Sequence, residues 1–196
     1  DDSKQIDQFN SIVRKIKKID IFINASYPKT KNWNKINFKS KNFKLFKENM
    51  NLHLNTFVWF SKIIAEKMKK NKVKGVILNF SSIYGSVSQD ISIYKNTNIS
   101  YNVAYSAIKG GISSFTRLLA AYYGKYGIRA NCISPGGILD KKKMNKKFIK
   151  NYSKRVPVGR MANVKEISAP SIFLVSEESS YINGHNLFVD GGWTCI

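Results

Sequence analysis

Residues 73–82 read VKGVILNFSS, a nearly continuous apolar run that ends in two serines. A short run of this kind, without alternation of polar and apolar residues, predicts a parallel strand that is buried on both faces. Three further stretches have the same character and are expected to join the same sheet: DIFINASY (20–27), IRANCISPGG (128–137) and HNLFVDGG (185–192).

Amphipathic segments separate these strands. Apolar residues recur at helical spacing in the first 19 residues, and further helices are predicted over 43–69, 102–123 and 164–178, the last with Asn163 as its cap. The remaining connections are a polar, aromatic loop at 83–100 and a basic, irregular stretch with helical patches at 138–162. Alternating helices and buried strands predict an α/β fold built on a doubly wound parallel sheet.

The stretch 20–27 has the composition of a central strand, which needs a neighbour on each edge. Downstream strands can supply one neighbour, but only a helix precedes it. We therefore expect residues 1–196 to form a single domain whose N-terminal part, the first βαβαβ portion, is missing from this sequence.

Composition limits the possible functions. Hydrophobic residues make up 43% of the 196, and the apolar runs are far shorter than the roughly 20 residues of a membrane span. Two cysteines without metal-ligand spacing indicate a reducing, cytoplasmic setting and no metal site. The net charge of +21 would suit a polyanion partner, but the lysines are scattered among Asn and Ile, so we expect no nucleic-acid partner.

Residues 101–111, YNVAYSAIKGG, place two tyrosines and a lysine at four-residue intervals on a predicted helix. A free tyrosine has a pKa of about 10, and an ammonium group one helical turn away favours the phenolate, which suits proton transfer. Ser82 ends a predicted parallel strand, where α/β sheets place ligand-contacting residues. Spacing alone leaves open whether the tyrosine and lysine are a catalytic pair or a half-exposed helix pair.

Six motifs narrow the choice: INAS (23–26), NFSSIYG (79–85), YSAIK (105–109), IRANCISPGG (128–137), PVGRMAN (157–163) and VDGGW (189–193). Together they resemble the single-domain branch of the short-chain dehydrogenase/reductase family over essentially the whole chain. NASYP, SIYGSV and AYSAIKGG also resemble the flagellin modification protein A group, which is associated with bacterial surface-sugar biosynthesis.

The resemblance implies a role for each matching residue. Tyr105 matches the general acid/base, Ser82 the serine that orients the substrate oxygen, and Lys109 the lysine that binds the nicotinamide ribose. Tyr101 then becomes a helix-start or pocket-wall residue. The cofactor, NAD or NADP, is expected to contact Tyr105 and Lys109, and further residues that match the family: Asn24, Ala25, Pro135, Gly136 and Ile138. Asn131 and Asp190 are instead expected to stabilise the fold or assembly.

The sequence departs from the family pattern at the catalytic site. The family's fourth catalytic position, a helix asparagine, is matched by His53, which either relays protons through water or is a buried helix residue. An extra loop, SVSQDISIYKNTNIS, should lie over the substrate site. We expect substrate contacts from Ser82 and from three residues in or beside this loop: Tyr84, Tyr94 and Lys95.

Two further departures concern the cofactor. INASY replaces the usual Asn-Asn-Ala-Gly, so residues 25–27 should change the packing near the adenosine. The family's glycine-rich turn, which cradles the dinucleotide diphosphate at a helix N-terminus, has no counterpart in this sequence. We therefore expect the 196 residues alone to bind dinucleotide weakly and to be inactive.

The sequence thus predicts an NAD(P)-dependent oxidoreductase that transfers a hydride between nicotinamide and a carbonyl or hydroxyl carbon of a sugar-like substrate. The resemblance implies a homodimer or homotetramer for the complete enzyme, in the cytoplasm and without a membrane partner. The alternative is a non-catalytic basic binding protein on a degenerate dehydrogenase fold. An enoyl-reductase reading would need a tyrosine seven positions before Lys109, where Asn102 stands.

Overall fold

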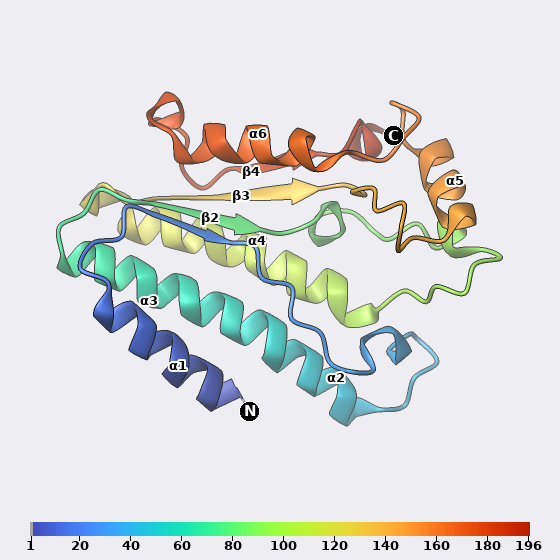
Figure 1. Cartoon of the computed structure of the whole chain (residues 1–196), viewed down its shortest axis with the longest axis horizontal. Helices are drawn as coiled ribbons and strands as arrows, with labels where there is room; N and C mark the ends of the chain where they lie inside the picture. The colour runs from blue at the N-terminus through green and yellow to red at the C-terminus, as the bar shows by residue number, and fades with distance from the viewer. Residues whose placement is uncertain (1) are drawn as a thin grey trace.

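The computed structural model describes residues 2–196 and shows a parallel sheet between layers of helices (Figure 1). The strands follow chain order across the sheet: β1 (Ile21–Asn24), β2 (Val76–Phe80), β3 (Arg129–Pro135) and β4 (Asn186–Val189). The helices are α1 (Asp2–Lys15), α2 (Phe43–Met50), α3 (Thr56–Lys70), α4 (Val103–Tyr123), α5 (Lys146–Arg155) and α6 (Val164–Val175). Helices α1, α3 and α4 lie on one face and α6 on the other, so the predicted α/β class is confirmed.

β1 forms an edge of this sheet and pairs only with β2 among the described residues. Ile21 and Ile23 are 49% and 47% exposed, whereas Ile77 and Leu78 on β2 are fully buried. The strand predicted at 20–27 is therefore present but short, with one outer edge open. Unpaired backbone groups on such an edge can accept another strand.

Buried polar side chains tie the two strands β1 and β2 to the helices below them. Asn24 Nδ2 donates to the carbonyl of Phe57 on α3 at 3.2 Å and to Ser61 Oγ at 3.4 Å. Ser61 Oγ donates to Asn79 Oδ1 at 2.9 Å, and Asn79 Nδ2 donates to Thr116 Oγ1 on α4 at 2.9 Å. This network fixes α3 and α4 against the sheet, because each buried amide finds a partner.

The helix predicted over 43–69 is present, but it is not uniform. α2 and α3 are joined by a π-helical turn, Asn51–Asn55, in which one extra residue is accommodated. Such turns occur frequently at functional sites, and this one carries His53 at its centre. The apolar periodicity of the sequence did not predict the turn.

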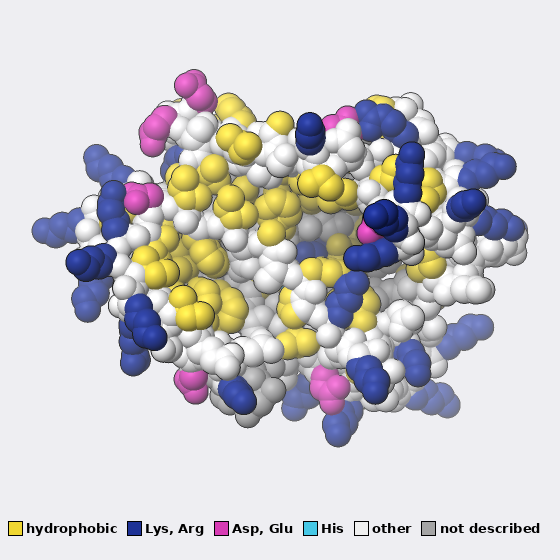
Figure 2. Space-filling view, viewed as in Figure 1, with side chains coloured by type: hydrophobic (Ala, Val, Ile, Leu, Met, Phe, Trp, Pro, Cys, Tyr) yellow, Lys and Arg dark blue, Asp and Glu magenta, His cyan; other side chains and the backbone are white. Residues whose placement is uncertain are grey.

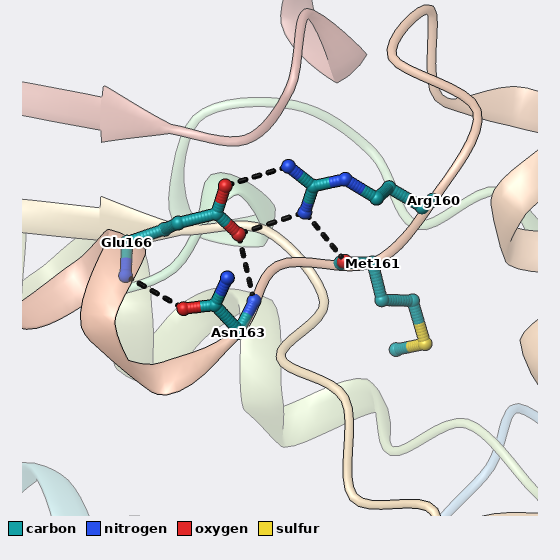
Figure 3. Close-up of polar contacts among 4 residues, drawn as sticks. All are labelled: Arg160, Met161, Asn163 and Glu166. Carbon is teal, nitrogen blue, oxygen red and sulfur yellow. Dashed lines mark hydrogen bonds and ion pairs between the residues drawn. The ribbon is translucent and has the colours of Figure 1, made fainter.

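A network at the start of α6 holds the chain segment that precedes it (Figure 3). Asn163 Oδ1 accepts a hydrogen bond from the Glu166 backbone amide, and the Glu166 carboxylate accepts one from the Asn163 amide, as in a capping box. Arg160 adds a bidentate ion pair to Glu166 at 2.6 and 2.7 Å. The Met161 side chain points away from this network and is buried.

The surface carries the high positive charge in scattered positions. Figure 2 shows lysine and arginine side chains around the rim of one face, with apolar side chains gathered in a band between them. Within residues 2–196, no helix has the length and apolar character needed to cross a bilayer. No cluster of candidate metal ligands occurs in the same residues, and both Cys132 and Cys195 are free thiols.

Candidate active site

The structure brings Ser82, Tyr105 and Lys109 together. Ser82 follows the C-terminal end of β2, and its Oγ caps the short 3-10 turn Ile83–Gly85 by accepting from the Tyr84 amide. This turn lies on α4: a Cβ atom at Gly85 would come within 2.7 Å of the Lys109 carbonyl carbon. Glycine is therefore required at position 85 for the serine turn to approach the helix.

The two adjacent serines have different partners. Ser81 Oγ donates to the Lys109 carbonyl at 2.8 Å and accepts from Ser113 Oγ at 2.9 Å, so it anchors β2 to α4. Ser82 instead faces the cavity described next. The geometry favours Ser82 over Ser81 as the residue that meets a substrate, in agreement with the motif.

A cavity of about 390 Å³ opens beside Tyr105 and Ser82. Its wall is largely aromatic, and the Tyr84 side chain, 9% exposed, places there a buried hydroxyl that has no hydrogen-bond partner in the described chain. The aromatic members of the lining are Tyr27, Trp33, Tyr84, Tyr94, Tyr101, Tyr105, Phe148 and Tyr152. Aromatic walls with a few convergent polar groups are typical of small-molecule sites.

The charge states at the site are set by burial. Burial raises the pKa of Tyr105, and the Ser82 hydroxyl opposes this rise. The net direction is opposite to the lowered pKa that the sequence motif led us to expect. Burial also lowers the pKa of Lys109 to about 8, while Cys132 acts in the other direction.

Lys109 is enclosed although it lies one turn from Tyr105. Its side chain is 3% exposed, and its Nζ donates to the Phe80 carbonyl at 2.9 Å. Three ring centroids surround the ammonium group: Tyr27 and Phe57 at 5.6 Å and Tyr105 at 5.8 Å. Lys109 does not line the cavity that Tyr105 lines.

His53 is fully buried, and neither ring nitrogen has a hydrogen-bond partner in the described chain. Its ring packs against those of Tyr27 at 5.3 Å, Trp33 at 5.9 Å and Phe57 at 6.2 Å. Burial, and secondarily the charge of Lys109, lower the pKa of His53 to about 3. The imidazole is therefore neutral at physiological pH.

The loop between Ser82 and α4 forms one side of the cavity. Tyr94 and Tyr101 line it, and burial raises the pKa of Tyr94 to about 12. Lys95 does not reach this cavity; it lines an adjoining hollow of about 640 Å³ whose wall also includes Tyr94 and Tyr101. Lys143 supplies the charged group of the inner cavity instead.

The residues predicted to contact the cofactor lie at the same ends of the strands. Gly136 lines the cavity beyond Pro135 at the end of β3, and Ile138 pairs with Ala162 in an isolated bridge. Asn24 ends β1, but its side chain is committed to α3, and the exposed Ala25 follows it. Asn131 and Asp190 make hydrogen bonds only within the C-terminal segment, which fits the predicted structural role.

Several site residues were not singled out from the sequence. Trp33 and Tyr152 both line the cavity, and the Tyr152 hydroxyl accepts from the Gly137 amide at 2.5 Å. Trp33 reaches the site because Asn102, the cap of α4, donates through Nδ2 to its carbonyl at 2.5 Å. The only signal in the sequence for this aromatic wall was the replacement of the family's usual Asn-Asn-Ala-Gly by INASY, which predicted altered packing near Tyr27.

Comparison with known proteins defines the class. A family model described as "Enoyl-(Acyl carrier protein) reductase" matches residues 1–194. The chain belongs to the short-chain dehydrogenase/reductase family, of which this model describes a branch, and its fold agrees with that assignment.

Individual relatives agree with this family assignment. The chain is 36% identical to the post-translational flagellin modification protein A of Campylobacter coli, over 91% of this chain and 69% of that protein. It is also 36% identical to glucose 1-dehydrogenase 2 of Bacillus subtilis, over 68% of this chain but only 49% of that protein. A short-chain dehydrogenase from Leptospira borgpetersenii, solved with bound NAD+, superposes with a TM-score of 0.85 at 35% identity, over 99% of this chain and 72% of that one.

Proposed function

We propose that this protein is an NAD(P)-dependent oxidoreductase that transfers a hydride to or from a carbon bearing a carbonyl or hydroxyl group. The observation that carries the proposal is the convergence of Ser82 and Tyr105 on one cavity, with Lys109 one helical turn behind. Membership of the family and the NAD+-bound relative support the same reaction class.

Each residue has a defined task in this proposal. Tyr105 gives its phenolic proton to the substrate oxygen in reduction and takes it back in oxidation. Ser82 holds that oxygen by a hydrogen bond, at the position where its Oγ faces the cavity. Because burial raises the pKa of Tyr105, the phenol is protonated at neutral pH and is ready to act as the acid.

The residues present fit the nicotinamide end of a dinucleotide. The Pro135–Gly137 turn follows a parallel strand at the edge where such sheets bind cofactors, and its glycines line the cavity next to Tyr105. Lys109 would hold the ribose, Ile138 the carboxamide, and Asn24 and Ala25 the adenosine side. The nicotinamide ring supplies the hydride acceptor or donor.

We further propose a sugar or sugar derivative as the substrate. The aromatic walls suit the C–H faces of a sugar ring, and we assign the ring hydroxyls to the polar side chains of Ser82 and Tyr84 in the same lining. Tyr94 and, from the adjoining hollow, Lys95 complete the proposed substrate contacts. The names of the flagellin modification and glucose dehydrogenase relatives support this class and a role in surface-glycan biosynthesis.

His53 is included as a proton-relay residue. Its two unpaired ring nitrogens lie beside Lys109, and a neutral imidazole can accept a proton at one nitrogen while donating from the other. We propose that it passes protons, through water, between Lys109 and the exterior.

The decisive experiment measures NAD(P)H-linked turnover of the full-length protein against a panel of aldoses and uronic acids, with a steroid and an enoyl thioester for comparison. Tyr105→Phe should lower kcat at least 100-fold, the usual scale for loss of a general acid. Tyr122→Phe, on an exposed part of the same helix, is the matched control and should retain activity.

Unchanged turnover in Tyr105→Phe would overturn the mechanism. Turnover of the enoyl thioester alone would overturn the substrate class and favour the activity named in the family description. The position of Asn102 argues against that outcome, because its side chain caps α4 and no tyrosine stands there.

A further inference from the structure

We propose that Tyr27 is a movable aromatic cover over Lys109, and that a dinucleotide ribose reaches the Lys109 ammonium only after this ring has moved aside. Tyr27 is thus a positioning residue that acts through Lys109. The inference rests on the proposed function for the identity of the incoming group, but the covering of Lys109 can be tested without it.

The first argument is the enclosure of Lys109. Within the described residues its ammonium group has one hydrogen-bond acceptor, the Phe80 carbonyl, and the ring centroids of Tyr27, Phe57 and Tyr105 lie 5.6–5.8 Å from it. With 3% of the residue exposed, the ammonium cannot meet a ribose hydroxyl in this arrangement. One of the three rings has to move before it can.

The second argument identifies which ring moves. Phe57 belongs to α3 and is 1% exposed, and Tyr105 belongs to α4, so both are fixed by helices that are tied to the sheet. Tyr27 lies in the connection between β1 and α2 and is 45% exposed. Residues 26–29 make no backbone–backbone hydrogen bond with the rest of the described chain, so moving them breaks no ladder.

The third argument concerns what holds the cover closed. The Tyr27 ring makes edge-to-face contacts with Trp33 at 5.7 Å, His53 at 5.3 Å and Tyr105 at 6.0 Å, and Lys29 Nζ lies 4.6 Å from its centroid. Aromatic pairs of this kind are each worth about 0.5–1.5 kcal/mol beyond buried area, a strength that a bound ligand can replace. The closed state is therefore stable but can be opened by binding.

The test is competitive acylation of the lysines at pH 8 with a trace amount of an amine-reactive acylating reagent. Mass spectrometry measures the extent of labelling at each lysine. Lys141, exposed on the surface, serves as the internal reference. Lys109 should label at least tenfold more slowly than Lys141 in the wild type and at least tenfold faster in Tyr27→Ala than in the wild type. Its pKa of about 8 makes the uncovered amine reactive at that pH.

Tyr27→Phe is the matched control and should leave Lys109 protected, because it keeps the ring and removes only the hydroxyl. Cys132, which is buried, reports on folding: it should stay unreactive toward maleimide in every variant. If Tyr27→Ala exposes Cys132, Tyr27→Leu replaces it in the comparison, with the same expected labelling of Lys109.

A second measurement links the cover to the cofactor. Calorimetry on the full-length protein measures the dissociation constants of NAD+ and NADP+ and shows which of the two dinucleotides binds. For that dinucleotide, the dissociation constant should be about fivefold lower in Tyr27→Ala than in Tyr27→Phe. The reason is that binding to Tyr27→Ala does not have to break the aromatic contacts of Tyr27. Added dinucleotide should protect Lys109 in Tyr27→Ala from acylation.

Rapid labelling of Lys109 in the wild type, or continued protection in folded Tyr27→Ala, would overturn the cover. A weaker dinucleotide affinity in Tyr27→Ala would overturn it as well, since it would make Tyr27 part of the binding surface. Absence of hydride transfer in the wild type would instead refute the proposed function while leaving the labelling result in place.

Discussion

The two flanks of Tyr105 differ in access. On the flank of the 83–100 loop, Ser82 and Tyr84 face an open cavity of about 390 Å³. On the flank of α3, the Lys109 ammonium lies shut behind Tyr27 and Phe57. The motif residues therefore meet at one place in the fold, while aromatic residues outside the motif decide which of them are accessible from outside.

The largest expected effect is a pH dependence of stability caused by His53 on the closed flank. Its pKa is about 3 in the folded chain against 6.5 for a free histidine, so between these values only the unfolded chain binds the proton. The free energy of unfolding should therefore fall as pH falls below 6.5, by roughly 3.5 kcal/mol by pH 4. His53→Asn should flatten the dependence, measured by urea unfolding followed by circular dichroism at pH 7 to 4.

The control for that series is His185→Asn, which changes an exposed histidine outside the site. It should keep the wild-type slope. Equal slopes for His53→Asn and the wild type would mean that the folded chain binds a proton at His53 about as readily as the unfolded chain, so that burial does not hold the imidazole neutral.

The next largest effect concerns Gly85, where the turn that follows Ser82 packs on α4 between the two flanks. Gly85→Ala places a Cβ atom 2.7 Å from the Lys109 carbonyl carbon and forces the serine turn away from α4. We expect it to lower the free energy of unfolding by about 3 kcal/mol, at the upper end for overpacking. Gly159→Ala, at a positive φ but with open space around its Cβ, should cost only about 1 kcal/mol. Equal costs in urea unfolding would contradict the close approach.

A third prediction separates the two serines. Ser82→Ala should lower kcat about 100-fold, close to 2.7 kcal/mol, and cost at most about 1 kcal/mol of stability, because its Oγ also accepts a hydrogen bond from the Tyr84 amide. Ser81→Ala should lower stability by about 1–2 kcal/mol, because the buried hydrogen bonds of Ser81 Oγ to the Lys109 carbonyl and to Ser113 Oγ are lost, while most of the turnover is kept. Steady-state kinetics and thermal unfolding of both variants give the answer. The reverse assignment would move the substrate oxygen to Ser81.

The smallest effect concerns the far wall of the open cavity. Asn163→Ala removes the cap of α6 and should cost about 1 kcal/mol of stability. Met161 follows Arg160 in the chain and lines the cavity, so KM should rise while kcat stays close to that of the wild type. A fall in kcat without a change in KM would show that the network acts on the reacting groups directly.

Much of the framework could be predicted from the sequence. Every strand predicted from a continuous apolar run is present, because burial on both faces leaves a clear signal in composition. A strand end and helical spacing predicted where Ser82, Tyr105 and Lys109 lie, but only the resemblance of the surrounding motifs singled them out as a catalytic set. Strand and helix ends were predicted less well: α6, predicted to Glu178, ends at Val175.

The arrangement of the closed flank could not be predicted from sequence patterns in the same way. Tyr27, Trp33 and His53 meet through contacts between a loop, a short 3-10 turn and a π-helical turn, none of which has a periodic pattern. The direction of the Tyr105 pKa also depended on burial, which a four-residue spacing does not report. Helix α5 was expected only as helical patches in a basic, irregular stretch, whereas it is a regular helix that packs against the turn Ile91–Tyr94.

The π-helical turn at Asn51–Asn55 makes chain length itself part of the site. A widened turn accommodates one extra residue in about the same rotation as a regular turn, so the buried faces of α2 and α3 stay aligned across it. Deleting a single residue there would restore a regular helix without turning α2 away from its neighbours. It would, however, remove the widened turn that carries the His53 ring among Tyr27, Trp33 and Phe57.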